Sequence, residues 1–141
     1  LQSLIKELNI VDKVIFKENI SDQELFSLYK NAELFILLPQ NIDHDIEGFG
    51  LGFVEAAAFG LPVIGALNSG AIDAILDKQN GFLIDPQDID EAAKKIEYIL
   101  SDENLQNNFR IKSVEFAKSL DWSIIIKKYL KIYELLFKGS V

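Results

Sequence analysis

Two glutamates flank a glycine-rich turn near the middle of the chain. Seven residues separate Glu47 from Glu55, and among them are Gly48, Gly50 and Gly52. Glycines just before a helix let a ligand approach the backbone, and the first N–H groups of the helix then favour an anion. Because a carboxylate in an apolar run is costly to bury, we expect Glu55 to have a partner or to face a cleft. The stretch therefore predicts a ligand site at the start of a helix.

Simpler interpretations of the same residues stay open at this point. Glu47 could be a solvated loop acid, Glu55 an exposed helix acid, and the glycines ordinary turn residues. The loop at 43–47 has three acids and His44, and it could be drawn as a metal site. Neighbouring loop acids are more often only solvated, so we expect no metal. Because the chain has no cysteine, disulfides and thiol chemistry are excluded.

The bulk composition fits a single globular domain over residues 1–141. The net charge of −8 argues against nucleic acid or an anionic membrane surface as a partner. The apolar run from Gly48 to Leu67 has about the length of a membrane span. Glu55 and Pro62 interrupt this run, so we reject that interpretation. We expect a cytoplasmic protein.

The elements that would position the site alternate between strands and helices. Continuous apolar runs predict buried strands at 14–16, 34–38, 62–66 and 82–84. Helical periodicity and caps predict helices at 1–9, 22–31, 50–59, 71–76, 88–100, 104–120 and 122–137. This alternation implies right-handed crossovers and a parallel α/β sheet with helices on both faces. Ligands bind such sheets beyond the carboxyl ends of the strands, where residues 40–50, 67–70 and the turn after Ile84 lie.

Some side chains carry more specific expectations. Ser21 and Glu24 form a capping box at the start of the second helix. We expect that helix to bury its apolar residues, which are Leu25, Phe26, Leu28 and Tyr29. We expect Trp122 to anchor the last helix on the core, and part of that helix's apolar face to cover a partner surface.

The residues around the two glutamates resemble a known signature, the donor-binding motif of the retaining glycosyltransferases of family 4. The resembling segments are 47–51, 55–56 and 60–64, with flanking likeness at 12–16, 28–35, 38–39, 69–73, 80–84 and 121–122. Members of this family have the GT-B fold, in which two Rossmann-like domains face a cleft. The resemblance implies that the chain is most of the C-terminal, donor-binding domain. It would be a Rossmann-like parallel sheet without its first strands, followed by a helical C-terminal tail.

The resemblance implies that Glu47 is the catalytic group. It would face the donor sugar and stabilise positive charge at the anomeric carbon in an oxocarbenium-like state. The family generally needs no metal and no other cofactor. The donor would be a nucleotide-diphosphate sugar such as a UDP- or GDP-sugar, and a glycan or lipid acceptor would bind a separate N-terminal domain. Such enzymes serve polysaccharide or glycolipid assembly, and a peripheral position on the inner face of the membrane is the alternative to a free cytoplasmic one.

The resemblance also implies the residues that bind the donor. Gly48, Phe49, Gly50 and Leu51 would meet the sugar or the diphosphate, chiefly through backbone N–H groups and the positive end of the helix. Glu55 would accept hydrogen bonds from the ribose hydroxyls of the nucleotide.

The chain departs from the family pattern in three respects. Ser69, Gly70 and Asp73 stand where the family has two glycines and a glutamate. Nothing corresponds to the arginine and lysine that hold the donor diphosphate, because Arg110 is the only arginine and lies in a late helix. In strand order 3-2-1-4-5-6 the missing strands are 1 and 2, which opens an edge of the strand at 34–38. We therefore expect the chain to be part of a longer protein and to be inactive by itself. We also expect the strands at 14–16 and 34–38 either to pair directly with each other or to associate with another copy of the chain.

Two other functions are compatible with the resemblance. One is a non-catalytic nucleotide-sugar-binding or interaction module that works with a partner subunit. The other is a related GT-B enzyme, such as a sugar-nucleotide epimerase or a glycogen-type synthase. The pattern around Glu47 and Glu55 favours the family-4 transferase over this last class.

Overall fold

Three parallel strands form one sheet in the computed structural model, which describes residues 1–39 and 49–138. The strands are β1 (Phe35–Leu37), β2 (Val63–Ala66) and β3 (Gly81–Ile84), and they lie in the order β1-β2-β3. Ile36 is opposite Ile64, which is opposite Phe82. The parallel α/β sheet and the adjacency of these three strands are therefore confirmed.

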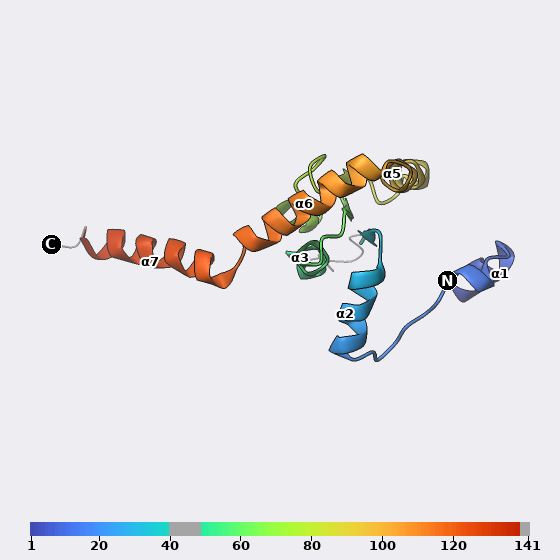
Figure 1. The fold of residues 1–141 in the computed structure, drawn as a ribbon, viewed down its shortest axis with the longest axis horizontal. Helices are drawn as coiled ribbons and strands as arrows, with labels where there is room; N and C mark the ends of the chain where they lie inside the picture. Colours follow the sequence, from blue (N-terminus) through green and yellow to red (C-terminus); the bar gives the residue numbers. More distant parts are fainter. Residues whose placement is uncertain (40–48, 139–141) are drawn as a thin grey trace.

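Helices connect and cover the strands (Figure 1). They are α1 (Gln2–Glu7), α2 (Asp22–Asn31), α3 (Leu51–Ala58), α4 (Ala71–Ala74), α5 (Ile89–Ser101), α6 (Glu103–Ser119) and α7 (Trp122–Lys138), with a 3-10 turn at Val11–Lys13. The crossover from β1 to β2 carries α3, and the crossover from β2 to β3 carries α4.

Alternating strand residues divide the core between the two faces of the sheet. Val63 packs in a cluster with residues of α2, α3 and α4, whereas Ile64 packs in a second cluster with residues of α5 and α6. Successive side chains of a strand point to opposite faces, so the two clusters lie on opposite sides of β2. The expected cover of helices on both faces is confirmed.

A glycine in β2 sets how closely α4 approaches the sheet. A Cβ atom added at Gly65 would lie 2.5 Å from Ile75 Cδ1 and 2.8 Å from Ala71 Cβ. Both distances are below normal van der Waals contact, so a larger residue would push α4 away from β2.

Side-chain caps account for the starts of three helices. Ser21 Oγ accepts a hydrogen bond from the Glu24 N–H at 3.3 Å, and Asp88 Oδ1 accepts one from the Glu91 N–H at 2.8 Å. Asp102 caps α6 in the same way. These oxygens satisfy N–H groups that the first helical turn leaves unpaired.

The strand predicted at 14–16 is wrong. Val14 has an extended backbone, but residues 14–16 belong to no strand, and Ile15 is 78% exposed. A strand needs a neighbour for its backbone N–H and C=O groups, and this segment has none within the described residues. Direct pairing of this segment with β1 is therefore not found. In α2, Tyr29 is buried as expected, but Phe26 and Leu28 are exposed.

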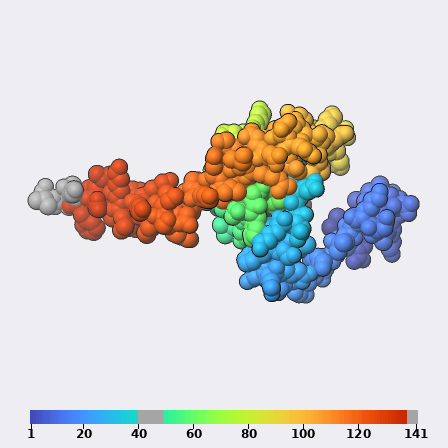
Figure 2. All heavy atoms as spheres, viewed as in Figure 1, coloured from blue at the N-terminus to red at the C-terminus, as the bar shows by residue number. Residues whose placement is uncertain are grey.

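The first and last helices extend away from the sheet. Figures 1 and 2 show α1 at one end of the molecule and α7 at the other, with the sheet and remaining helices between them. Trp122, at the start of α7, is 77% exposed, so the prediction that it anchors this helix on the core is wrong. The reason is that α7 leaves the body from its first turn. Over the described ranges, no helix is long and apolar enough to cross a membrane.

Candidate functional site

The chain enters α3 through a left-handed glycine. Gly50 has φ 75°, and its C=O accepts a hydrogen bond from the Phe53 N–H at 2.9 Å. A Cβ atom at this position would lie 2.8 Å from Phe53 Cδ2. A side chain would therefore be strained both by the backbone conformation and by the buried ring of Phe53. Glycine at position 50 sets the sharp turn that begins α3.

The residues on either side of buried Gly50 lie at the surface. Phe49 is 43% exposed and Leu51 is 66% exposed, and α3 has no acidic residue in its first turn. The partial positive charge of this helix end is thus not neutralised from within the first turn. Glu47 and Gly48 lie outside the described residues, and their proposed roles stay predictions.

Glu55 lies one turn further along α3, and its side chain is exposed. Its carboxylate oxygen Oε2 accepts a hydrogen bond from the Tyr29 hydroxyl of α2 at 3.3 Å. The sequence analysis missed this contact, because the two residues are 26 positions apart in the chain. The available signal was the buried position of a tyrosine, since a buried phenol usually needs a hydrogen-bond partner.

Tyr29 is held by aromatic rings. Its own ring stacks on Phe59 at 5.4 Å between centroids and lies 6.0 Å from the ring of Phe35. Only 8% of the residue is exposed. Burial raises the pKa of the Tyr29 hydroxyl above its usual value of 10.0, and the negative charge and hydrogen bond of Glu55 raise it further. The Tyr29 hydroxyl therefore stays protonated at neutral pH and can donate a hydrogen bond to Glu55.

A serine shapes the loop at the carboxyl end of β2. Ser69 is buried, and its hydroxyl donates to the Ala66 C=O at 2.9 Å while accepting from the Ala71 N–H at 3.2 Å. Gly70 follows as the N-cap of α4, and Asp73 is exposed in the first turn. Ser69, one of the residues at which the sequence departs from the expected pattern, thus stabilises the loop between β2 and α4.

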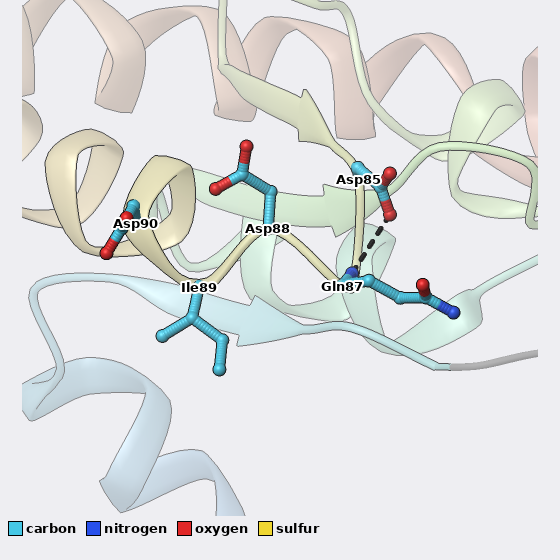
Figure 3. A pocket seen from close by; sticks show the side chains of 5 residues that line it. All are labelled: Asp85, Gln87, Asp88, Ile89 and Asp90. Atoms are coloured by element: carbon cyan, nitrogen blue, oxygen red, sulfur yellow. Dashed lines mark hydrogen bonds between the residues drawn. The ribbon is translucent and has the colours of Figure 1, made fainter.

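A pocket of 580 Å³ follows the carboxyl end of β3 (Figure 3). It is lined by Asp85, Gln87, Asp88, Ile89 and Asp90. The Gln87 N–H donates to Asp85 Oδ1 at 2.9 Å. Three carboxylates disfavour a diphosphate, so an anionic ligand fits the start of α3 better than this pocket.

The only arginine of the chain lies far from the start of α3. Arg110 lines a groove with Phe59 and Gly60, which follow the last turn of that helix. Gly50 and Gly60 bracket the whole of α3, so Arg110 is at the opposite end from the candidate site. In the part of the chain that the structure describes, no group of three or more acidic or histidine side chains could hold a metal ion.

The family to which the chain belongs is shown by sequence comparison. The model of the family described as glycosyl transferases group 1 matches residues 1–115. The chain belongs to this glycosyltransferase family. This match supports the predicted relationship to the GT-B glycosyltransferases.

Two relatives illustrate the range of the family. The chain is 30% identical over 130 residues to the D-inositol 3-phosphate glycosyltransferase of Corynebacterium diphtheriae, covering 92% of this chain and 29% of the relative. It is 29% identical over 104 residues to the GDP-mannose-dependent alpha-(1-6)-phosphatidylinositol monomannoside mannosyltransferase of Mycolicibacterium smegmatis, covering 72% of this chain and 27% of the relative.

A solved structure has the same fold. The sucrose-phosphate synthase from Thermosynechococcus elongatus superposes with a TM-score of 0.77 at 28% identity, over 99% of this chain and 34% of that protein. The three-stranded sheet and its helices thus correspond to a Rossmann-like domain of a GT-B enzyme. The chain spans about a third or less of the length of these three proteins.

Proposed function

We propose that this chain binds the nucleotide-diphosphate sugar of a retaining glycosyltransferase. The observation that carries the proposal is the start of α3. There the left-handed backbone of Gly50, itself buried, begins the helix between two exposed residues, and Glu55 is exposed one turn later. A helix N-terminus favours the diphosphate, and a carboxylate accepts hydrogen bonds from a diol. The relative named as GDP-mannose-dependent supports a nucleotide sugar as the donor class.

In this proposal the two glutamates have different tasks. Glu47 faces the sugar and stabilises the positive charge that develops on the anomeric carbon as the bond to the diphosphate breaks. Glu55 binds the ribose and positions the nucleotide. The backbone at Phe49, Gly50 and Leu51, with Gly48 before it, meets the sugar or the diphosphate. No cofactor or metal takes part.

The rest of the enzyme completes the reaction. We propose that a separate N-terminal domain binds a glycan or lipid acceptor, and that the 141-residue chain by itself transfers no sugar and binds nucleotides weakly. The position of Arg110 at the far end of α3 supports this, because the diphosphate then needs cations from elsewhere. We place the enzyme in polysaccharide or glycolipid assembly in the cytoplasm or on the inner face of the membrane.

The test measures transfer by the full-length gene product with single substitutions. Glu47→Ala lowers kcat by about 100- to 1000-fold, as expected when a group that stabilises transition-state charge is lost. Glu55→Ala raises the donor KM by about tenfold or more with a smaller effect on kcat, because it removes hydrogen bonds to a charged group. Glu97→Ala, an exposed acid on α5, is the control and leaves both parameters unchanged.

The outcomes separate the possible functions. Unchanged rates in both Glu47→Ala and Glu55→Ala would refute the site assignment. Nucleotide-sugar binding that depends on Glu55, without transfer to any acceptor, would instead favour a non-catalytic binding module.

A further inference from the structure

The contact between Tyr29 and Glu55 joins a buried residue to an exposed one. The ring of Tyr29 contacts the rings of Phe35 and Phe59, in the core cluster that links α2, α3 and β1. Glu55 is exposed, and its neighbours Ala56 and Ala57 are buried. A glutamate side chain on a helix surface samples several rotamers, and fixing one of them costs free energy. The buried tyrosine therefore constrains the exposed carboxylate, and not the reverse.

We propose that Tyr29 is a positioning residue that holds one oxygen of the Glu55 carboxylate, so that the other oxygen is presented to the ribose hydroxyls of the donor nucleotide. This inference rests on the function proposed above for Glu55. A carboxylate has about four lone-pair sites, and Tyr29 occupies one of them on Oε2. Oε1 and the remaining sites are enough for the two hydroxyls of a ribose diol.

The length of the contact fits such a role. The 3.3 Å between the two oxygens is longer than the typical O–H···O distance of about 2.7–2.8 Å. A nucleotide that covers Glu55 removes water from the carboxylate, which strengthens its bond to the phenol.

The matched variant is Tyr29→Phe, which keeps the ring in place and removes only the hydroxyl. In the full-length gene product we expect it to raise the donor KM, and the dissociation constant of the nucleoside diphosphate, by about two- to tenfold, which corresponds to one side chain left to be ordered on binding. We expect kcat to stay within about twofold, because the hydroxyl does not touch the reacting atoms. Tyr98→Phe, in an exposed tyrosine of α5, is the control and changes neither constant.

A second measurement assigns the effect to the ribose. UDP, GDP and ADP are compared with their 2′-deoxy forms in binding to the wild type, Tyr29→Phe and Glu55→Gln. We expect the wild type to prefer the ribose form of the nucleotide that binds it. Glu55→Gln abolishes most of this preference, and Tyr29→Phe reduces it. A loss of affinity that is equal for both forms would show that Tyr29 acts on the fold and not on ribose recognition.

Titration of Tyr29 tests the pairing without any ligand. The Tyr29 signal is identified in NMR spectra of 13C-labelled tyrosine by its loss in Tyr29→Phe. Its pKa lies above the usual value because of burial, followed by the charge and hydrogen bond of Glu55. In Glu55→Gln we expect the pKa to fall, although burial keeps it above the usual value. An unchanged pKa would overturn the pairing.

The results distinguish failure of this inference from failure of the proposed function. If Glu55→Gln weakens nucleotide binding and Tyr29→Phe does not, the positioning role is wrong while Glu55 keeps its function. If Tyr29→Phe tightens binding, Tyr29 competes with the ligand for the carboxylate, and the proposal is overturned. If none of the three nucleotides binds, the proposed function fails and the positioning role fails with it. The same conclusion follows if Glu55→Gln leaves nucleotide affinity unchanged although the titration shows that Tyr29 and Glu55 are paired.

Discussion

A buried polar side chain connects α6 to the segment that leads into β2. Ser113 of α6 is fully buried, and its hydroxyl donates to the Leu61 C=O at 2.7 Å, just before β2 begins. We expect Ser113→Ala to lower the free energy of unfolding by about 1–2 kcal/mol, because it removes a buried hydrogen bond and leaves a carbonyl without this donor. Urea denaturation of the 141-residue chain measures the change.

The matched control for this prediction is Ser119→Ala at the end of the same helix. Ser119 also donates to a backbone carbonyl, that of Phe116 at 2.6 Å, but it is exposed. Water replaces that hydrogen bond, so we expect a change within about 0.5 kcal/mol. Equal effects of the two substitutions would show that the Ser113 contact does not stabilise the packing of α6.

Part of the candidate site can be predicted from the sequence, and part of it cannot. The spacing of Gly50 and Glu55 predicts a helix start and an acid one turn later, and both belong to one continuous segment. The contact of Glu55 with Tyr29 depends on how α2 packs against α3, and no local pattern contains that information. Periodicity predicts that Tyr29 is buried, but not where its hydroxyl points.

Among the elements, two glycines differ in the room that the packing of α3 and α4 on the sheet leaves for a side chain. Gly65 of β2 has no room for a methyl group, whereas at Gly52 of α3 a Cβ would make an ordinary contact of 3.4 Å with Phe35. We expect Gly65→Ala to destabilise the chain by about 1–3 kcal/mol through overpacking. Gly52→Ala should stabilise it by about 0.5–1 kcal/mol through higher helix propensity. Thermal and urea unfolding measure both, and the same sign for the two changes would contradict this packing argument.

The start of α7 depends on pH through its capping aspartate. Asp121 Oδ1 accepts a hydrogen bond from the Ser123 N–H at 2.8 Å, and hydrogen bonding to Ser123 lowers the pKa of Asp121 below its usual value of 3.8. A lowered pKa in the folded state means that the cap is fully formed above that usual value and is lost as the pH falls through the folded value. We expect the Ser123 amide to lose protection from hydrogen exchange only below about pH 4. Asp121→Asn should remove this pH dependence, and protection that is independent of pH in the wild type would contradict the assignment.

Elements with local start signals are predictable from the sequence, and those that need distant partners are not. The capping residue Ser21 marks a helix start that the structure confirms. The apolar run at 14–16 resembles the other buried strands, but a strand forms only where a neighbour supplies hydrogen bonds. The sequence pattern of the segment cannot show whether that neighbour is present.

At the scale of the molecule, apolar side chains are exposed both at the open edge of the sheet and on the helices that leave it. On β1, Ile36 is 40% exposed and Leu37 is 38% exposed, although their neighbours on β2 are buried. β1 pairs with β2 on one side and, within residues 1–39 and 49–138, with no strand on the other. An open apolar edge of a sheet is a template for pairing with another chain. The exposed side chains of α7 form a second apolar surface, separated from the sheet in Figure 1.

We expect the 141-residue chain to self-associate through the outer edge of β1. Sedimentation velocity should show an average mass that rises with concentration, and hydrogen exchange at Phe35–Leu37 should slow in parallel. Leu37→Lys should shift the chain towards monomer, because a lysine on an edge strand opposes pairing with another strand. Leu130→Lys places the same charge on α7, where the leucine is 53% exposed, and should leave association unchanged.

The two substitutions decide which apolar surface carries the association. Dissociation by Leu130→Lys alone would assign it to α7 and leave the edge of β1 without a role. A chain that stays monomeric at all concentrations, with fast exchange at Phe35–Leu37, would contradict self-association altogether. Association through β1 would mean that the outer edge of this strand is competent to pair with a strand of another chain, and that its exposed apolar side chains become covered when it does so.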